Sequence, residues 1–155
     1  MDSSLDRIDR NILTLLQRDA RLTHQEIADR IGSSPTSVWR RVQNLEARGV
    51  IKARVALVDR KSIGLDVCVI CNVKLSHHSD ETRLKFESFV ASLSEVTECY
   101  AVSGSHDYSL KVVVRDVEAY ERLLTRQLLN HPLVDSAASS FTLREVKYST
   151  ELSPP

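Results

Sequence analysis

The feature that most constrains this chain is a four-residue turn between two short amphipathic segments in its first third. The turn is Gly32-Ser33-Ser34-Pro35, in which glycine closes one helix and serine followed by proline opens the next. Thr23 and Glu26 form a capping box that predicts where the earlier helix begins. An apolar stripe at helical spacing predicts a further helix before it, ending near Asp19. We therefore predict three helices, of which the second and third form a helix-turn-helix unit.

The third predicted helix has one apolar face and a polar face opposite to it. Val38, Val42 and Leu45 recur at the spacing of a buried stripe. Hydroxyl, amide and arginine side chains occupy the other positions, and such groups can bond base edges and phosphates from a DNA groove. We expect Trp39 to be a partial member of the core or a packing lid, and not a side chain that intercalates between bases. The predicted DNA contacts are Ser34, Thr36, Ser37, Arg40, Arg41, Gln43 and Asn44.

Charge is unevenly distributed along the chain, although Lys plus Arg and Asp plus Glu both total 21. Residues 1–60 contain 11 basic and 8 acidic side chains, and the remainder contains 10 and 13. A basic stripe confined to one segment is expected of a phosphate-binding face, but a solvated helix surface explains charge alone equally well. The turn and the polar helix face decide in favour of DNA.

The rest of the chain predicts the order strand-helix-strand-strand-helix-strand. The first strand shows apolar residues at every second position over 67–75, and others are expected at 97–103, 108–114 and about 136–148. This order is the ferredoxin-like split βαβ pattern, so the fold class is α+β. Two helices cover one face of such a sheet, and the other face needs a cover such as a second subunit.

A domain boundary is predicted where the chain becomes polar and contains a glycine, at residues 59–64. The loosely alternating residues 50–58 predict a strand that leaves the helical unit. The expected division is a helix-turn-helix domain over 1–52, a hinge strand and linker over 53–65, and a ferredoxin-like domain over 66–155.

Composition argues against several other classes of protein. No run of eighteen apolar residues is present, so no transmembrane helix is expected, and the acidic, polar N-terminus resembles no signal or transit peptide. An odd number of cysteines, three, predicts reduced thiols in a cytoplasmic protein.

The sequence gives little support for a metal site or for a catalytic site. Cys68 and Cys71 have the spacing of a metal motif, but on a strand they point to opposite faces, and adjacent His77 and His78 also diverge. Zinc needs four convergent ligands. With four glycines and no phosphate-loop, dinucleotide or nucleophile-elbow motif, we expect no metal, no cofactor and no enzymatic activity.

The segment Gly104-Ser105-His106-Asp107 joins two predicted strands and has two possible interpretations. It is a tight turn in which Asp107 bonds its own backbone, or a site for a free amino acid. In the second case turn amides would hold a carboxylate and Asp107 would hold an ammonium group.

Taken together, the chain resembles the Lrp/AsnC family of bacterial and archaeal transcription regulators over nearly its full length. The segments that carry the resemblance are LDRIDRNIL (5–13), RLT (21–23), RRVQNLEARGVI (40–51), IGL (63–65), SGSHDY (103–108) and SSFTL (139–143). The resemblance implies a winged helix-turn-helix, a hinge strand and a ferredoxin-like effector domain called RAM. It also implies dimers that pair their sheets and assemble into octameric rings.

The resemblance further implies an amino-acid effector bound between dimers near the glycine-aspartate turn, and a pseudo-palindromic DNA operator. The matching effector positions are Ser103, Gly104 and Asp107, with Tyr108 close by. Cys99 and Ser140 are weaker candidates on adjoining strands. A similar two-domain fold occurs in sirohaem decarboxylases, but the basic recognition helix disfavours that enzymatic alternative.

Overall fold

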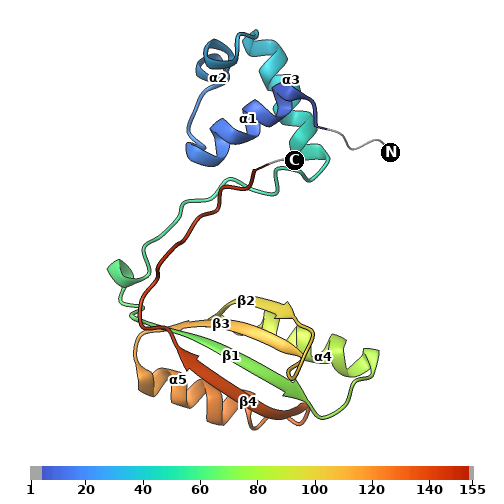
Figure 1. Ribbon diagram of the computed structural model, residues 1–155, viewed down its shortest axis with the longest axis vertical. Coiled ribbons are helices and arrows are strands. Elements are labelled where there is room, and N and C mark those ends of the chain that lie inside the picture. The colour runs from blue at the N-terminus through green and yellow to red at the C-terminus, as the bar shows by residue number, and fades with distance from the viewer. Residues whose placement is uncertain (1–4, 154–155) are drawn as a thin grey trace. The chain divides into compact units, whose positions relative to one another are not determined.

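The computed structural model describes residues 5–153 (Figure 1). Residues 1–4 lie outside the described residues. They are part of the acidic, polar segment that we compared with signal and transit peptides. The chain divides into two compact units. The first unit comprises the residues up to Leu57 together with those from Lys147 onward, and the second unit runs from Val58 to Val146.

The first unit is helical, as predicted. Thr23 and Glu26 form the expected capping box, and Gly32 closes the second helix in the left-handed conformation with φ 67°. Ser34 caps the third helix by accepting a hydrogen bond from Ser37 N, and Pro35 occupies its first turn. The helices are α1 (Arg7–Arg18), α2 (His24–Ile31) and α3 (Pro35–Ala47).

A small apolar core holds these three helices together. Val38, Val42 and Leu45 of α3 are buried, as their spacing predicts, and they pack with Ile12 of α1 and Ile27 of α2. Each such side chain stabilises the folded state by about 1.5–3 kcal/mol relative to an exposed position. The core therefore fixes which face of α3 remains in solvent.

The second unit is a four-stranded antiparallel sheet with helices, and its element order confirms the α+β prediction. The strand order is β2-β3-β1-β4, so the two central strands are β3 and β1. The elements are a 3-10 turn (Lys61–Ile63), β1 (Val67–Leu75), α4 (Asp80–Ala91), β2 (Val96–Ala101), β3 (Tyr108–Val114), α5 (Val117–Leu123), a π-helical turn (Leu124–Leu128) and β4 (Val134–Phe141).

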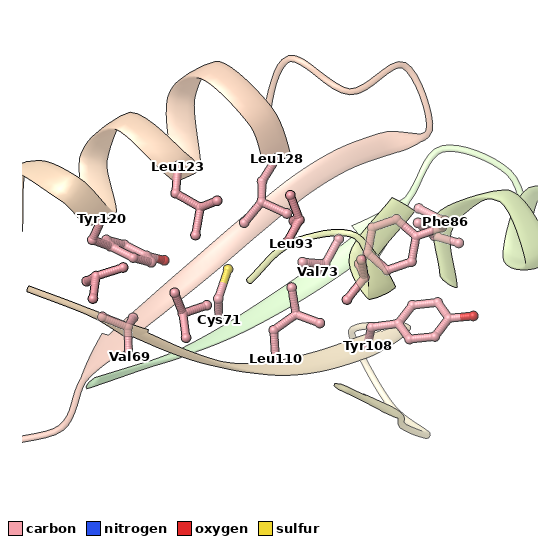
Figure 2. Close-up of a cluster of buried hydrophobic side chains, with 14 residues drawn as sticks. Val69, Cys71, Val73, Phe86, Leu93, Tyr108, Leu110, Tyr120, Leu123 and Leu128 are labelled. Carbon is pink, nitrogen blue, oxygen red and sulfur yellow. The ribbon is translucent and has the colours of Figure 1, made fainter. Parts of the chain in front are cut away.

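One face of this sheet forms the core with α4 and α5 (Figure 2). Cys71 at the middle of β1 is buried here, whereas Cys68 lies on the other face, as strand alternation predicts. The rings of Phe86 and Tyr108 lie 4.8 Å apart, and Tyr120 meets Phe141 edge to face. These contacts tie α4 to the central strand β3 and α5 to the edge strand β4.

Two sequence expectations about strands are wrong. No strand forms over residues 50–58, and β4 ends at Phe141 instead of continuing to about residue 148. Both segments alternate apolar and polar residues, but a strand also needs a neighbour to accept and donate its backbone hydrogen bonds. Within the described residues neither segment pairs with a strand beyond the single backbone bond from Thr142 N to Cys68 O of β1, and Val55 and Val146 are exposed. None of the helices between residues 5 and 153 has the length and apolar character needed to cross a bilayer.

Candidate DNA-binding and effector sites

The solvent face of α3 carries polar side chains that are free to meet a ligand. Thr36, Arg40, Gln43 and Asn44 are exposed, and Ser37 is half-buried. Trp39 is 52% exposed, so it is at most a partial member of the core. These groups lie opposite the buried stripe, which makes them available to base edges in a groove as wide as a helix.

Arg40 is the cation of this face with the fewest constraints. Its side chain makes no hydrogen bond or ion pair with any residue in the described range 5–153. Gln43 donates to Glu46 over 3.2 Å and Arg48 donates to Asn44 over 3.3 Å, both in solvent. Exposed bonds of this length are easily exchanged for bonds to DNA.

The first turn of α3 offers a second kind of contact. Ser34 Oγ accepts from Ser37 N over 3.2 Å and is exposed, so its hydroxyl proton remains available for an acceptor. Helix N-termini favour anions because of their unpaired amides and the helix dipole. This end of α3 is suited to a phosphate.

Arg41 stands in a different environment from Arg40, although it is the next residue. Its Nη1 donates to Asp6 Oδ2 over 2.7 Å and to Asp9 Oδ1 over 2.8 Å. Asp9 is buried in α1, and Asp6 caps the same helix by accepting from Asp9 N. That backbone hydrogen bond and the bond from Arg41 lower the pKa of Asp6, and the two carboxylates raise the pKa of Arg41. Arg41 therefore joins α3 to the start of α1.

In the second unit, Asp107 ends the turn between β2 and β3 and bonds the backbone on both sides. Its amide donates to Val73 O over 2.9 Å, and its Oδ2 accepts from Leu75 N over 2.8 Å. Its carbonyl accepts from Val102 N over 2.9 Å, and Gly104 adopts φ 121°, which L side chains rarely reach. The segment is thus a turn, as predicted, but the Asp107 side chain bonds the amide of Leu75 on β1 and not the backbone of its own turn, so that part of the prediction is wrong.

The same carboxylate also faces a cavity of about 230 Å³. Asp107 Oδ1 lies 3.2 Å from His78 Nδ1, and both residues line the cavity. Arg83 is held at the wall by Asp80 and by the carbonyl of His78. The lining residues are Leu75, His78, Arg83, Ala101, Val102, Asp107 and Tyr108.

The structure brings together only some of the predicted effector residues. Asp107 and Tyr108 line the cavity, whereas Ser103 and Gly104 lie exposed in the turn beside it. Cys99 lies exposed on β2 opposite Leu110. Ser140 is on β4, two strands away from β3. Within one subunit, Ser140 is therefore separated from the cavity.

Tyr108 also lines the cavity, and its side chain is uncharged. Its hydroxyl donates to Glu87 Oε1 over 2.8 Å. Burial and this hydrogen bond raise the pKa of Tyr108 to about 12, so the phenol stays protonated at neutral pH.

Comparison with known proteins finds one matching family model for each part of the chain. Residues 68–152 match the family model described as the Lrp/AsnC ligand binding domain, and residues 5–52 match that of a winged helix-turn-helix DNA-binding domain. The chain belongs to the Lrp/AsnC family. Like the relatives it matches, this Lrp/AsnC protein is a DNA-binding transcriptional regulator with a ligand-binding domain, not an enzyme.

Relatives of this Lrp/AsnC protein match it almost end to end. It is 34% identical over 148 residues to the DNA-binding transcriptional activator DecR of Escherichia coli K12, covering 96% of this chain and 97% of DecR. It is 39% identical to the leucine-responsive regulatory protein of Klebsiella pneumoniae, with 96% and 90% covered.

Solved structures show the same fold. A transcriptional regulator of Neisseria meningitidis in complex with L-methionine superposes with a TM-score of 0.90 at 34% identity, covering 98% of this chain and 97% of that chain. Escherichia coli AsnC superposes with a TM-score of 0.89 at 27% identity, with 97% and 99% covered.

Proposed function

We propose that this regulator binds an amino acid, or a closely related small molecule, in the cavity beside Asp107, and that occupancy changes its binding to an operator. The observation that carries this proposal is the carboxylate of Asp107 facing a cavity of about 230 Å³ whose wall also holds His78 and Arg83. As a DNA-binding protein without a predicted membrane segment, it is proposed to act in the cytoplasm.

The lining of the cavity matches the chemistry of a free amino acid. An ammonium group needs an anionic acceptor, which Asp107 provides, and a carboxylate needs donors, which Arg83 and His78 provide. Leu75 and Val102 add apolar wall for a side chain. The complex of a related regulator with L-methionine supports this class of ligand.

We further propose that the cavity lies at a junction between subunits of a homo-oligomer. Ser103 and Gly104 are exposed beside the cavity and are suited to meet a neighbouring subunit. A ligand that contacts two subunits binds the assembled state more tightly than the separated one, so occupancy and assembly are coupled. Assembly through such junctions would build a ring such as an octamer from dimers.

Dimers are proposed to form through the sheet face that α4 and α5 leave uncovered. Ile70 and Val113 lie on this face, together with the ion pair of Lys111 and Glu98 at 2.8 Å. Burying an apolar face is the main source of stability in homodimers. Two copies of α3 would then read the two halves of a pseudo-palindromic operator.

The test of the effector proposal is a thermal-shift screen of the twenty standard amino acids against wild type, Asp107→Asn and Asp107→Ala. Asparagine keeps an oxygen acceptor for Leu75 N while it removes the charge and replaces the second carboxylate oxygen with an amide NH2 group, whereas alanine also orphans the Leu75 amide. Wild type should gain a higher unfolding midpoint with one ligand or a few related ones, because binding stabilises by mass action.

Asp107→Asn should fold normally and lose that ligand-induced shift. Asp135→Asn, which changes an exposed carboxylate of β4 outside the cavity, is the matched control and should respond like wild type. A wild-type protein that responds to none of the twenty, or an Asp107→Asn protein that responds with the same midpoint shift, would contradict the proposal.

A further inference from the structure

The last turn of α1 holds a backbone segment from the far end of the chain. Gln17 Nε2 donates to Leu152 O over 2.9 Å, and Leu152 N donates to Gln17 Oε1 over 2.7 Å. The side-chain amide thus satisfies both polar backbone groups of one residue, as a neighbouring strand would. A pairing of this kind selects an extended backbone whatever its side chains are.

An ion pair adds a second contact beside the first. Arg18 Nη2 lies 2.8 Å from Glu151 Oε1, and Glu151 N donates to Ser149 Oγ over 3.1 Å. An exposed ion pair contributes little by itself, so Gln17 is the main anchor and Arg18 sets the register.

The same segment is also anchored where it leaves the sheet. Thr142 N and Thr142 Oγ1 donate to Cys68 O of β1 over 2.9 and 3.0 Å. Residues 142–153, here called the return segment, are therefore fixed at one end on β1 and at the other end on α1.

We propose that the return segment is a second tether of the DNA-binding unit, docked on the last turn of α1. The chain leaves the first unit after Leu57 and rejoins it at Lys147, so the docked segment closes a loop that the linker alone would leave open. Closing a loop removes conformational freedom. Because α1 is joined to α3 through Asp9 and Arg41, the tether reaches the recognition helix by a path that bypasses the linker.

The occupant of the α1 surface is the return segment of the same chain. The contact forms within one copy and uses residues of one compact unit. Docking of the segment from a second copy is the alternative that the test must distinguish.

Hydrogen exchange of the full chain tests the docking. The peptide spanning residues 147–153 should exchange at least about tenfold more slowly in wild type than in Gln17→Leu, which removes both backbone contacts. Gln127→Leu, a change of an exposed glutamine in the π-helical turn, should leave the exchange rate unchanged. Equal exchange in wild type and Gln17→Leu would overturn the proposal.

Cross-linking decides which copy supplies the segment. Arg18→Cys and Glu151→Cys are combined in a Cys99→Ser background, because Cys99 is the exposed native thiol and Cys68 and Cys71 are buried. A short bismaleimide should give a product that still migrates as one 17.5 kDa chain in a denaturing gel. A covalent dimer, or no cross-link, would contradict docking within one chain.

The single tryptophan, Trp39, reports whether the docked segment restrains the unit. It lies in α3 of the first unit, so its time-resolved fluorescence anisotropy follows the motion of that unit. Gln17→Leu should increase the amplitude of the fast, nanosecond depolarisation, whereas Leu152→Ala, which keeps both backbone bonds, should behave like wild type. Unchanged anisotropy in a Gln17→Leu protein that has lost its exchange protection would refute the tether.

Discussion

Arg40 and Arg41 show how one step along a helix changes what a side chain does. Helical periodicity predicts that Arg41 lies nearer the buried stripe than Arg40. It does not reveal Asp6 and Asp9, because their position depends on how α1 packs against α3. From the sequence both arginines are therefore predicted to bind DNA, and the structure gives Arg41 a contact inside the protein.

Alanine substitutions should separate the two arginines. Arg40→Ala should weaken binding to a DNA selected from a random pool with wild-type protein by about 1–3 kcal/mol and leave the unfolding free energy unchanged. Arg41→Ala should lower the unfolding free energy by about 1–3 kcal/mol, because Asp9 loses a charged partner. Denaturant unfolding and fluorescence titration measure the two effects.

The salt dependence of DNA binding provides the control for this pair. A residue that contacts phosphate contributes about one to the slope of log K against log salt concentration. The slope of Arg41→Ala should equal that of wild type. A slope reduced by about one, with unchanged stability, would show that Arg41 leaves the carboxylates and binds phosphate.

Asp6 should make the first unit sensitive to acid. Its pKa in the folded protein is lowered from the ordinary value of 3.8, mainly by the amide of Asp9 and by Arg41. Its stabilising contribution is therefore present above pH 3.8 and lost as the pH falls through the lower, folded-state value.

The measurement is the unfolding midpoint as a function of pH for wild type and Asp6→Asn. Asparagine retains a side-chain oxygen that can cap α1 but cannot hold a charge. The two proteins should differ above pH 3.8 and converge as the pH falls from 3.8 through the lower, folded-state pKa of Asp6. A constant difference at every pH would mean that the charge of Asp6 contributes nothing. Asp66→Asn, at an exposed aspartate outside α1, is the control.

Among the elements, α3 has a structural role at its first turn, and we propose that the same turn also contacts DNA. Ser34→Ala should destabilise the protein by about 1 kcal/mol, because Ser37 N loses its cap. Ser34→Asp should preserve the cap and the stability, since aspartate is as good a cap as serine. The added negative charge should nevertheless weaken DNA binding, as it would face phosphates.

Circular dichroism and DNA titration check both variants of Ser34 together. If Ser34→Asp binds the selected DNA as tightly as wild type, the N-terminus of α3 does not approach the phosphate backbone. A Ser34→Ala protein of wild-type stability would show that Ser34 does not cap α3 in solution.

Local signals predict helices better than strands in this chain. The caps of α2 and of the start of α3 depend on neighbouring residues such as Thr23, Gly32 and Ser34, so both starts and the end of α2 are predicted correctly. Residues 50–58 alternate like a strand, but the bonding partner of a strand lies elsewhere. Alternation therefore predicts an extended conformation without saying whether a sheet forms.

The residues of the cavity also show that local sequence patterns do not reveal partners that are distant in the sequence. Asp107 and Tyr108 stand out because they follow a glycine turn between two strands. His78 and Arg83 come from the loop after β1 and from α4, and they join the wall only through the fold. The one available signal for them is that they follow β1, the strand that pairs with β3. A ferredoxin-like order predicts that pairing, although not the side-chain directions.

For the whole molecule, we expect a homodimer or a larger even-numbered assembly, because α4 and α5 do not cover the sheet face that carries the half-buried Ile70. Val113 on the same face is already buried within one chain. Ile70→Glu should shift the protein toward monomer in light scattering. Ile63→Glu, at an exposed position of the 3-10 turn, is the matched control. A wild-type protein that remains a 17.5 kDa monomer at micromolar concentration would contradict this expectation.

The response of DNA binding to ligand is the property on which the proposed function depends. Labelled DNA selected with wild-type protein is titrated with wild type and with Asp107→Asn, each with and without the amino acid that raises the unfolding midpoint. We expect that ligand to change the Kd of wild type by about 5- to 150-fold, the usual range of allosteric coupling. Asp107→Asn should show the ligand-free Kd of wild type and no change on adding ligand. An unchanged Kd in wild type, or a full response in Asp107→Asn, would contradict an effector site at Asp107.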